Sequence, residues 1–249
     1  MERCILTGSS GFLGSALSAE LSNQGFKVTP LTRDWETIPK DTKYIYYLAT
    51  YGNMYDQTDE EEIFRVNVAG TYRLLKATEE IPYKRMVYVS SSSVLLPNQT
   101  AYSKAKCQAE VFCESFRKPI SIVRPYSVTG VGEQESHLIP TLIRAAYSGE
   151  EVPFVPTPRH DFIDIEDVVR NLISISQASR GTYPIGSGKS YSNQEVLAMV
   201  EYVTGKTINT REVESLRSYD TTDWKAPYSV AHKPLLQSIG EMVKAYDRK

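Results

Sequence analysis

The stretch ERCILTGSSGFLG, residues 2–14, decides the fold of this 249-residue chain. Its apolar run at residues 4–6 is typical of a short buried strand. Three glycines follow at intervals of three residues: Gly8, Gly11 and Gly14. Leucines then recur at helical spacing: Leu13, Leu17 and Leu21. The stretch therefore predicts a strand, a glycine turn and a helix in immediate succession.

Together, these three elements are the start of a nucleotide-binding βαβ unit. Glycine lacks a Cβ atom, so the backbone can turn tightly and approach a pyrophosphate closely. The N-terminus of the helix then presents free N–H groups and partial positive charge to that anion. An ordinary tight turn into a helix is the alternative. The position of the glycines directly after the first strand favours the dinucleotide site.

The composition fits one large α/β domain, or one domain with a small lobe. Hydrophobic residues make up 41% of the chain, and the net charge is −2. This charge gives no basic field for nucleic acid or for an anionic membrane, so neither is an expected partner. The sequence contains no apolar run of about 18 residues, so no transmembrane helix is expected. The first strand begins almost at Met1, so no signal peptide is expected.

The cysteines bear on metal binding and on the cellular compartment. Three are present, Cys4, Cys107 and Cys113, and they cannot all pair with one another. None is spaced with a histidine as metal ligands are, so no metal site is expected. We expect all three to be small buried apolar side chains, in a protein of the reducing cytoplasm.

The first half of the chain alternates strand-like and helix-like segments. Strands are expected at residues 26–31, 44–50, 86–89 and 120–123. Helices are expected at residues 60–79 and 102–116. This alternation predicts an α/β fold with a doubly wound parallel (Rossmann) sheet, covered on both faces. Ligands bind such sheets at the carboxyl ends of the strands, where each candidate site segment of this chain lies.

The second half is broken into shorter pieces by proline residues. Helices are expected at residues 164–176 and 192–204, the second with Asn193 as its cap and Gly205 as its stop. These shorter segments predict a smaller mixed lobe for substrate binding. We assign residues 1–127, joined by roughly 160–180, to the dinucleotide domain, and residues 128–159 and 181–249 to the lobe.

The pattern Tyr-x-x-x-Lys, the signature of short-chain dehydrogenases, occurs three times: Tyr72/Lys76, Tyr102/Lys106 and Tyr202/Lys206. Context separates the three pairs. Tyr102 alone follows a buried strand that ends in serines, at residues 90–93. It also opens a helix, which places Lys106 one turn further on and on the same face. The other two pairs lie late in helices and are expected to face solvent.

The chemistry of the Tyr102 pair is direct. A free tyrosine has a pKa near 10 and is a poor base at neutral pH. Lowering that pKa by roughly 3 units takes about 4 kcal/mol of preferential stabilisation of the phenolate. The Lys106 ammonium supplies part of it, and a positive nicotinamide ring supplies more. Tyr102 would then exchange a proton with a substrate hydroxyl while hydride passes between carbon and nicotinamide, and a serine hydroxyl would bond the same oxygen.

At this point the chain resembles the extended short-chain dehydrogenase/reductase family, within its NAD-dependent epimerase/dehydratase group that modifies nucleotide sugars. The resemblance covers most of the sequence. It is carried, in the family's order, by TGSSGFLG, YLAT, NVAGTYRLLKA, YVSSSSV, YSKAK, RPYSVTG, HLIPTLI, DFIDIEDV, YPIGSGKSYS and WKAPYS.

The resemblance implies roles for individual residues. The implied cofactor-binding residues are Gly8, Ser10, Gly11, Phe12, Leu13, Gly14, Thr32, Arg33, Leu48, Ala49, Thr50, Asn67, Tyr102, Lys106 and Tyr126. The implied catalytic residues are Ser91, Tyr102, Lys106 and His137. The implied substrate-binding residues are Ser92, Ser127, His137 and Arg159. His137 stands where a histidine of some relatives acts as an acid during epimerisation, and helix capping or packing is its alternative role.

The end of the second predicted strand bears on the choice of cofactor. NAD sites need a carboxylate there to hold the ribose hydroxyls. The position is Thr32, and Arg33 follows it. A guanidinium without a carboxylate suits a 2′-phosphate, so NADP is the expected cofactor. NAD is the alternative, in which Asp34 supplies the carboxylate and Arg33 is only a solvated surface charge.

The serine run bears on the reaction. Dehydratases of the family carry an Asp-Glu pair directly after the catalytic Ser/Thr, where this chain has Ser92 and Ser93, so dehydration is not expected. The resemblance favours a reductase that acts on the 4-keto group of a nucleotide-linked sugar. A C4 epimerase with a retained NAD is the first alternative. A non-catalytic nucleotide-binding scaffold or sensor is the second, and the intact set of Ser91, Tyr102 and Lys106 argues against it.

The chain also departs from the family pattern. Only ten residues separate Ser91 from Tyr102, and the segment 34–43 lacks a helix and a strand that relatives keep. Arg159 is displaced by one position from the place of an arginine that holds the nucleotide diphosphate, which implies an altered substrate site. The helices at 60–79 and 102–116 are those by which relatives pair, so a homodimer is expected.

Overall fold

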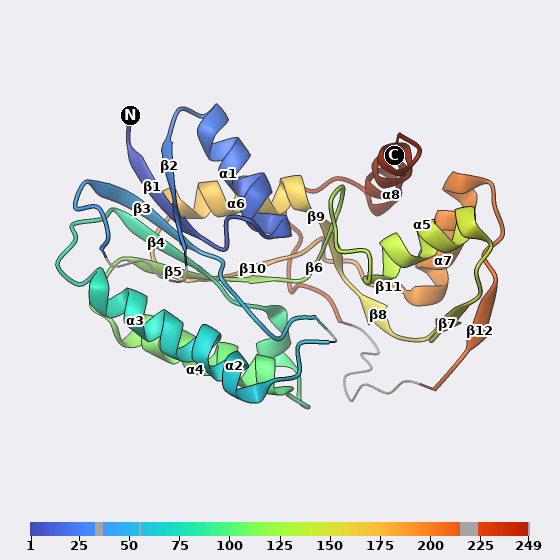
Figure 1. Ribbon diagram of the computed structural model, residues 1–249, viewed down its shortest axis with the longest axis horizontal. Coiled ribbons are helices and arrows are strands. Elements are labelled where there is room, and N and C mark those ends of the chain that lie inside the picture. Colours follow the sequence, from blue (N-terminus) through green and yellow to red (C-terminus); the bar gives the residue numbers. More distant parts are fainter. Residues whose placement is uncertain (33–36, 55, 215–223, 249) are drawn as a thin grey trace. The chain divides into compact units, whose positions relative to one another are not determined.

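The computed structural model describes residues 1–32, 37–54, 56–214 and 224–248 (Figure 1). The chain divides into two compact units. The first consists of Met1–Pro125 with Val169–Pro184, and the second of Tyr126–Val168 with Ile185–Lys249. Cofactor binding by the first unit and substrate binding by the second remain predictions.

A six-stranded sheet forms the centre of the first unit, with strand order β10-β5-β4-β3-β1-β2. The strands are β1 (Arg3–Thr7), β2 (Lys27–Leu31), β3 (Thr42–Tyr47), β4 (Arg85–Val89), β5 (Ile120–Pro125) and β10 (Thr182–Ile185). Neighbours from β2 to β5 pair in parallel. The carboxyl ends of β1, β3 and β4 therefore meet at one edge of the sheet, which is where parallel sheets bind ligands.

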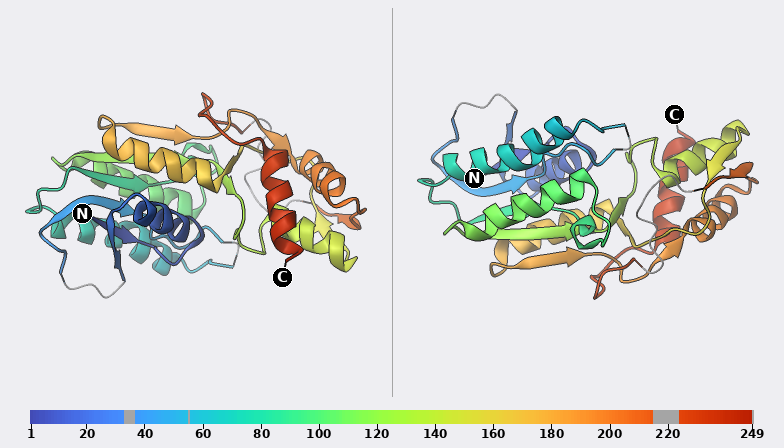
Figure 2. Two further views of the ribbon diagram at one scale, coloured as in Figure 1. Left: turned by 90° about the horizontal axis from the view of Figure 1, so that it is seen from above. Right: turned by 90° about the horizontal axis from the view of Figure 1, so that it is seen from below.

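Helices cover both faces of this sheet (Figures 1 and 2). One face carries α1 (Phe12–Asn23) and α6 (Ile165–Gln177), and the other carries α2 (Glu60–Phe64), α3 (Gly70–Ala77) and α4 (Ala101–Ser115). Because both faces are covered, the central strands are mainly apolar, and Cys4, Ile5 and Leu6 of β1 are fully buried. The predicted doubly wound parallel sheet is confirmed.

The predicted helix at residues 60–79 is a continuous series of helical turns, one of which differs in type. After α2 the chain makes a π-helical turn, η1 (Arg65–Ala69), and then continues as α3. The side-chain amide of Asn67 donates to the carbonyl oxygen of Ile63 at 2.9 Å. This carbonyl is the one that the Asn67 N–H would use in a regular α-helix, so the side chain displaces the backbone bond and the turn widens. Such single π turns are frequent at functional sites.

The predicted strand at residues 44–50 ends earlier than expected. β3 stops at Tyr47 because the next two backbone N–H groups, of Leu48 and Ala49, both donate to the Thr7 hydroxyl at 3.0 Å. Residues 48–50 form a loop instead. This loop lies against the end of β1 and belongs to the candidate site.

Three helices and several short strand pairs build the second unit. The helices are α5 (Leu138–Ser148), α7 (Asn193–Thr204) and α8 (Leu235–Tyr246). The strand pairs are β6 (Ser127–Thr129) with β9 (Phe162–Asp164), β8 (Arg159–His160) with β11 (Tyr191–Ser192), and β7 (Val152–Phe154) with β12 (Thr210–Glu212). The three helices enclose one apolar core, in which Ile139, Val196 and Ile239 are fully buried.

The cap of α7 corrects a detail of the sequence analysis. The helix is capped by Ser192, one residue before the predicted Asn193. The Ser192 hydroxyl accepts from the Glu195 N–H, and the Glu195 carboxylate accepts from the Ser192 N–H. This reciprocal pair is a capping box, and it occupies the position that Asn193 was expected to hold. The predicted stop at Gly205 is confirmed, with φ of 66°.

Asp161 organises the loops of the second unit. Its carboxylate is fully buried and accepts from the N–H and hydroxyl of Ser187 at 2.7 and 2.6 Å. It also accepts from the N–H groups of Gly188 at 2.9 Å and Ala226 at 2.8 Å. Two segments distant in sequence are thereby fixed to one side chain.

We expect Asp161→Ala to destabilise the protein by about 3 kcal/mol, because four donors, three of them buried, lose their acceptor. Urea unfolding at neutral pH measures this difference. The control is Asp41→Ala, which removes an exposed ion pair with Arg3. Its expected cost is below about 1 kcal/mol. Equal unfolding midpoints for the two variants would show that Asp161 does not organise the loops.

Candidate functional site

The glycine turn after β1 has the shape of a cradle for an anion. Gly8 adopts a φ of +68°, a backbone conformation that residues with a Cβ atom rarely adopt. A Cβ atom built on Gly14 would lie 2.0 Å from the carbonyl oxygen of Gly8. Helix α1 begins directly after Gly11, and no side chain caps its first turn. Its N–H groups are thus available to an anionic ligand, so the residues present fit a dinucleotide pyrophosphate.

A second loop approaches this turn from the end of β3. A Cβ atom on Gly8 would lie 2.9 Å from the backbone nitrogen of Ala49, so the two loops are in close contact. The Thr50 hydroxyl donates to the Asn67 side chain at 2.8 Å. The fully buried Asn67 also donates to the carbonyl of Tyr51 at 2.7 Å. Asn67 therefore holds the loop in place, through the π turn in which it lies.

Ser91, Tyr102 and Lys106 lie beside this loop. Ser91 follows β4 and caps the short 3-10 helix η2 (Ser92–Leu95), accepting from the Ser93 N–H at 3.1 Å. Tyr102 stands in the first turn of α4, and Lys106 one turn later. The Lys106 ammonium donates to the carbonyl oxygen of Val89, the last residue of β4, at 2.9 Å. The trio named from sequence is thus gathered at the carboxyl end of β4.

The pKa values of Tyr102 and Lys106 differ from the sequence-based expectation. Burial raises the pKa of Tyr102, and hydrogen bonding to the Thr50 and Ser91 side chains offsets this only in part. Burial also lowers the pKa of Lys106 to about 8. The expected lowering of the Tyr102 pKa by Lys106 is therefore not produced by these residues alone. A positive group next to the phenol, such as an oxidised nicotinamide ring, would add the missing charge.

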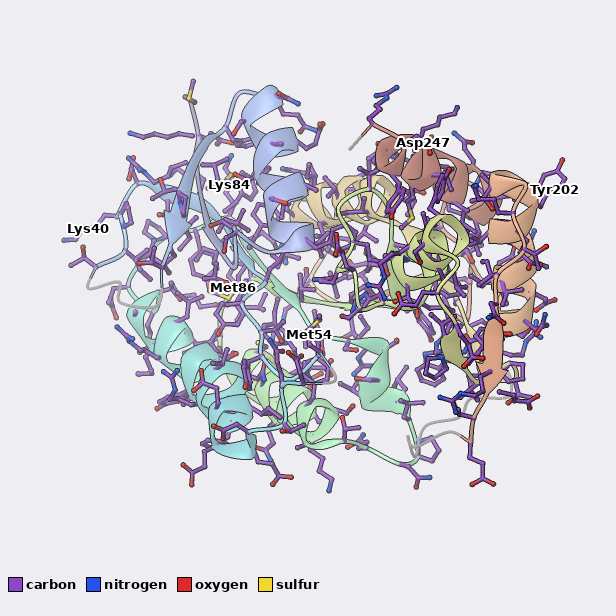
Figure 3. All side chains as sticks on the ribbon, turned by 45° about the vertical axis from the view of Figure 1, so that its right-hand side comes forward. Lys40, Met54, Lys84, Met86, Tyr202 and Asp247 are labelled. Atoms are coloured by element: carbon purple, nitrogen blue, oxygen red, sulfur yellow. The ribbon has the colours of Figure 1, made fainter. Side chains whose placement is uncertain are left out.

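The two other Tyr-x-x-x-Lys pairs lie elsewhere on the molecule. Tyr72 is 45% exposed on α3 and packs on the ring of Phe112, with 5.3 Å between centroids. Tyr202 is 79% exposed and projects outward from α7 (Figure 3). The expectation that both face solvent is confirmed.

Four further candidate residues belong to the second unit: Tyr126, Ser127, His137 and Arg159. Tyr126 packs against Trp224, with ring centroids 5.5 Å apart. Ser127 begins β6, and its N–H donates to the carbonyl of Asp161 at 2.9 Å. Arg159 donates to the Ser190 carbonyl at 2.7 Å and lies 3.1 Å from the Glu195 carboxylate.

His137 has a partner that the sequence analysis did not name. It occupies the N-cap position of α5, but its imidazole does not cap the helix. Nδ1 lies 3.0 Å from the carboxylate of Glu133, whose other oxygen accepts from the Thr129 hydroxyl at 2.7 Å. The spacing of four residues between Glu133 and His137 was the available signal.

Thr32 is the candidate residue at the end of β2. Thr32 follows β2 directly and is exposed, so no carboxylate stands at that position. Arg33 and Asp34 lie outside the described residues. In the part of the chain that the structure describes, no cluster of His, Cys, Asp and Glu is arranged to hold a metal ion. No helix in that part has the length and apolar character needed to cross a membrane.

A doubly wound sheet, a glycine cradle and a Ser/Tyr/Lys trio together define a nicotinamide-dependent enzyme of the extended short-chain dehydrogenase/reductase type. The sequence model of the NAD dependent epimerase/dehydratase family matches residues 4–186. The chain belongs to this family.

The individual relatives share only about a quarter of their residues with this chain. Sterol demethylase protein B of Methylococcus capsulatus is 24% identical over 245 residues, covering 81% of this chain and 74% of that protein. UDP-glucose 4-epimerase of Corynebacterium glutamicum is 24% identical over 273 residues, covering 83% of this chain and 82% of that protein. Among solved structures, MoeE5 in complex with UDP-glucose and NAD is 26% identical, covers 99% of both chains and has a TM-score of 0.86.

Proposed function

We propose that this enzyme reduces the 4-keto group of a nucleotide-linked sugar, with Tyr102 as the proton donor. One observation carries the proposal: Ser91, Tyr102 and Lys106 gather at the carboxyl end of β4, beside the glycine cradle. Ser92 and Ser93 follow Ser91 in η2, where a dehydratase of this family would carry its acid and base. The presence of nucleotide sugars in relatives such as MoeE5 supports this substrate class.

The roles follow from the positions. The Tyr102 hydroxyl donates its proton to the substrate oxygen, and the Ser91 hydroxyl bonds the same oxygen. The Lys106 ammonium, 5.9 Å from the centre of the Tyr102 ring, stabilises the phenolate that remains. The glycine cradle would hold a nicotinamide dinucleotide, whose chemistry at the carbonyl carbon would be hydride transfer. The carbonyl becomes an alcohol, and the reverse reaction uses the same groups.

A C4 epimerase is the second candidate, because UDP-glucose 4-epimerase is among the relatives. An epimerase oxidises and then reduces the same carbon, so it must retain its cofactor through the cycle. Denaturing the purified protein and identifying the released dinucleotide by mass spectrometry separates the two. Stoichiometric NAD that survives purification would indicate the epimerase. A protein without bound dinucleotide, which then binds NADPH more tightly than NADH, would indicate the reductase.

Activity on a panel of nucleotide-linked keto-sugars and sugars tests the substrate class. A steroid alcohol is included as the alternative substrate class, because Sterol demethylase protein B is also a relative. Cofactor binding without turnover of any of these would favour a nucleotide-binding scaffold or sensor instead. NADP as the cofactor is part of the proposal, supported by the missing carboxylate at Thr32. The complex of MoeE5 with NAD makes NAD the alternative.

We also propose a cytoplasmic location. Cys4, Cys107 and Cys113 are all free thiols. Burial raises the pKa of Cys4 to about 12, which keeps it an unreactive apolar group. Cys4 and Cys113 are buried, whereas Cys107 is only half-buried, contrary to the expectation that all three are buried. Free thiols fit a reducing compartment.

A homodimer through the helices on one face of the sheet is the expected assembly. Phe64 of α2, Tyr72 of α3 and Val111 of α4 are large apolar side chains that are 53%, 45% and 62% exposed. Val111→Glu should raise the dimer Kd by about 30-fold, because it would bury an unpaired charge. Size-exclusion chromatography at several concentrations measures this shift toward the 28.1 kDa monomer. Tyr202→Glu on α7 is the control, and a monomeric native protein would rule out the dimer.

A further inference from the structure

Lys106 is a buried cation with little protein solvation. Its side chain is among the largest that are fully buried, at 1% exposure. Its ammonium has three N–H donors, and the Val89 carbonyl takes one of them. A buried ammonium otherwise loses much of its hydration, which favours the neutral amine. A neighbouring group that favours the charged form therefore helps to keep Lys106 a cation beside Tyr102.

The face of an aromatic ring lies next to this cation. The Lys106 ammonium is 5.1 Å from the centre of the Tyr88 ring, on the strand that ends beside it. Tyr88 is fully buried and stacks on Tyr47 of β3, with centroids 5.7 Å apart and planes inclined by 22°. Both rings belong to the core between the sheet and helices α3 and α4. The ring of Tyr88 is therefore fixed in position under the ammonium.

Ring faces attract cations through the quadrupole of the π system, and the attraction is largest where water is excluded. The Tyr88 ring meets both conditions, since it is within about 6 Å of the cation and in a dry core. The ammonium lies over the face of the Tyr88 ring and not at its edge, which carries positive partial charge.

We propose that Tyr88 is a positioning residue of the active site, whose ring face holds the Lys106 ammonium in its charged form beside Tyr102. This role rests on the proposed function, in which Lys106 acts as a cation during proton transfer. In this role Tyr88 acts on the trio through Lys106.

Other charged and titratable groups also surround Lys106. Glu110 lies on the same helix and favours the charged lysine, but burial has the larger effect and lowers the lysine pKa to about 8. Glu110 is committed to Arg124 of β5, through hydrogen bonds of 3.0 and 2.5 Å. Burial raises the pKa of Cys113 beyond the physiological range, so its thiol is neutral. The aromatic face is thus a contribution that these groups do not replace.

The test measures the titration midpoint of Lys106 directly, by NMR of isotope-labelled lysine ε-carbons in the full chain without substrate. The Lys106 signal is assigned by its loss in Lys106→Met. We expect Tyr88→Phe, which keeps the ring face, to leave the midpoint near that of the native protein. Tyr88→Leu removes the face and should lower the midpoint by about one pH unit.

Tyr47→Leu is the matched control. It removes the neighbouring ring from the same core, so it should lower the unfolding midpoint to a similar extent. We expect a much smaller change in the Lys106 titration than in Tyr88→Leu, since the Tyr88 ring remains. Equal shifts in the two leucine variants, or no shift in Tyr88→Leu, would overturn the proposal. If Tyr88→Leu does not fold, fluorinated phenylalanines at position 88 weaken the ring face without changing its shape, and the midpoint should then fall stepwise with fluorination.

The readout is independent of turnover. A shifted midpoint in a protein that turns over no nucleotide sugar would leave the ring–lysine contact standing and count against the proposed function alone. An unshifted midpoint in an active reductase would count against the role of the Tyr88 ring and leave the proposed function standing.

Discussion

Tyr102→Phe lowers kcat on the nucleotide-linked substrate by about 10³-fold, because general acid–base catalysis by a positioned side chain contributes roughly 10²–10⁴ to the rate. The ring is retained, so the packing of α4 and the contact with Lys106 are preserved. Dinucleotide affinity should fall far less than kcat, since the cradle of Gly8, Gly11 and Gly14 is untouched. Steady-state kinetics, together with cofactor titration by fluorescence, separates the two effects.

The sequence itself provides the control for this experiment. Tyr202 belongs to the same Tyr-x-x-x-Lys pattern but is 79% exposed on α7. Tyr202→Phe should leave kcat, KM and cofactor affinity unchanged. Full activity in Tyr102→Phe would show that another acid donates the proton, and the pair of His137 and Glu133 would be the next candidate.

The candidate site could be predicted from the sequence where the signal is local. The glycine turn is a local property, because Gly8, Gly11 and Gly14 determine the path of a single turn. The choice of Tyr102 over Tyr72 and Tyr202 also came from local context, namely a preceding strand and the first turn of a helix. In both cases the neighbouring residues carry the information, so no knowledge of the tertiary structure was needed.

What the sequence did not predict depends on contacts between distant segments. The ring of Tyr88 lies under Lys106 because β4 and α4 pack together, and no spacing in the sequence encodes that contact. The π turn at Asn67 arises from a side-chain bond to Ile63 that competes with a backbone bond. The raised pKa of Tyr102 is a consequence of burial, which outweighs the hydrogen bonds that lower it. The balance of such effects is set by the three-dimensional structure.

Gly14→Ala has the largest expected effect on cofactor binding. The added Cβ would lie 2.0 Å from the carbonyl oxygen and 2.8 Å from the carbonyl carbon of Gly8. Both atoms are backbone, so no side-chain rotation can relieve the overlap, and α1 must move away from the turn. We expect a loss of dinucleotide affinity of more than about 100-fold, because the helix N-terminus no longer faces the pyrophosphate. The free energy of unfolding should fall by about 3 kcal/mol.

Gly240→Ala distinguishes this overlap from a general intolerance of glycine replacement. Gly240 lies in α8, and a Cβ atom there would have no neighbour within 4 Å among the described residues. Because alanine loses less backbone entropy in a helix than glycine, this variant should be more stable by about 0.5–1 kcal/mol, with unchanged cofactor affinity. Isothermal titration with NADPH and NADH, combined with urea unfolding, measures both variants. Native-like affinity in a folded Gly14→Ala protein would mean that α1 and the Gly8 turn can separate without losing the anion, so the pyrophosphate would have to be held by other groups.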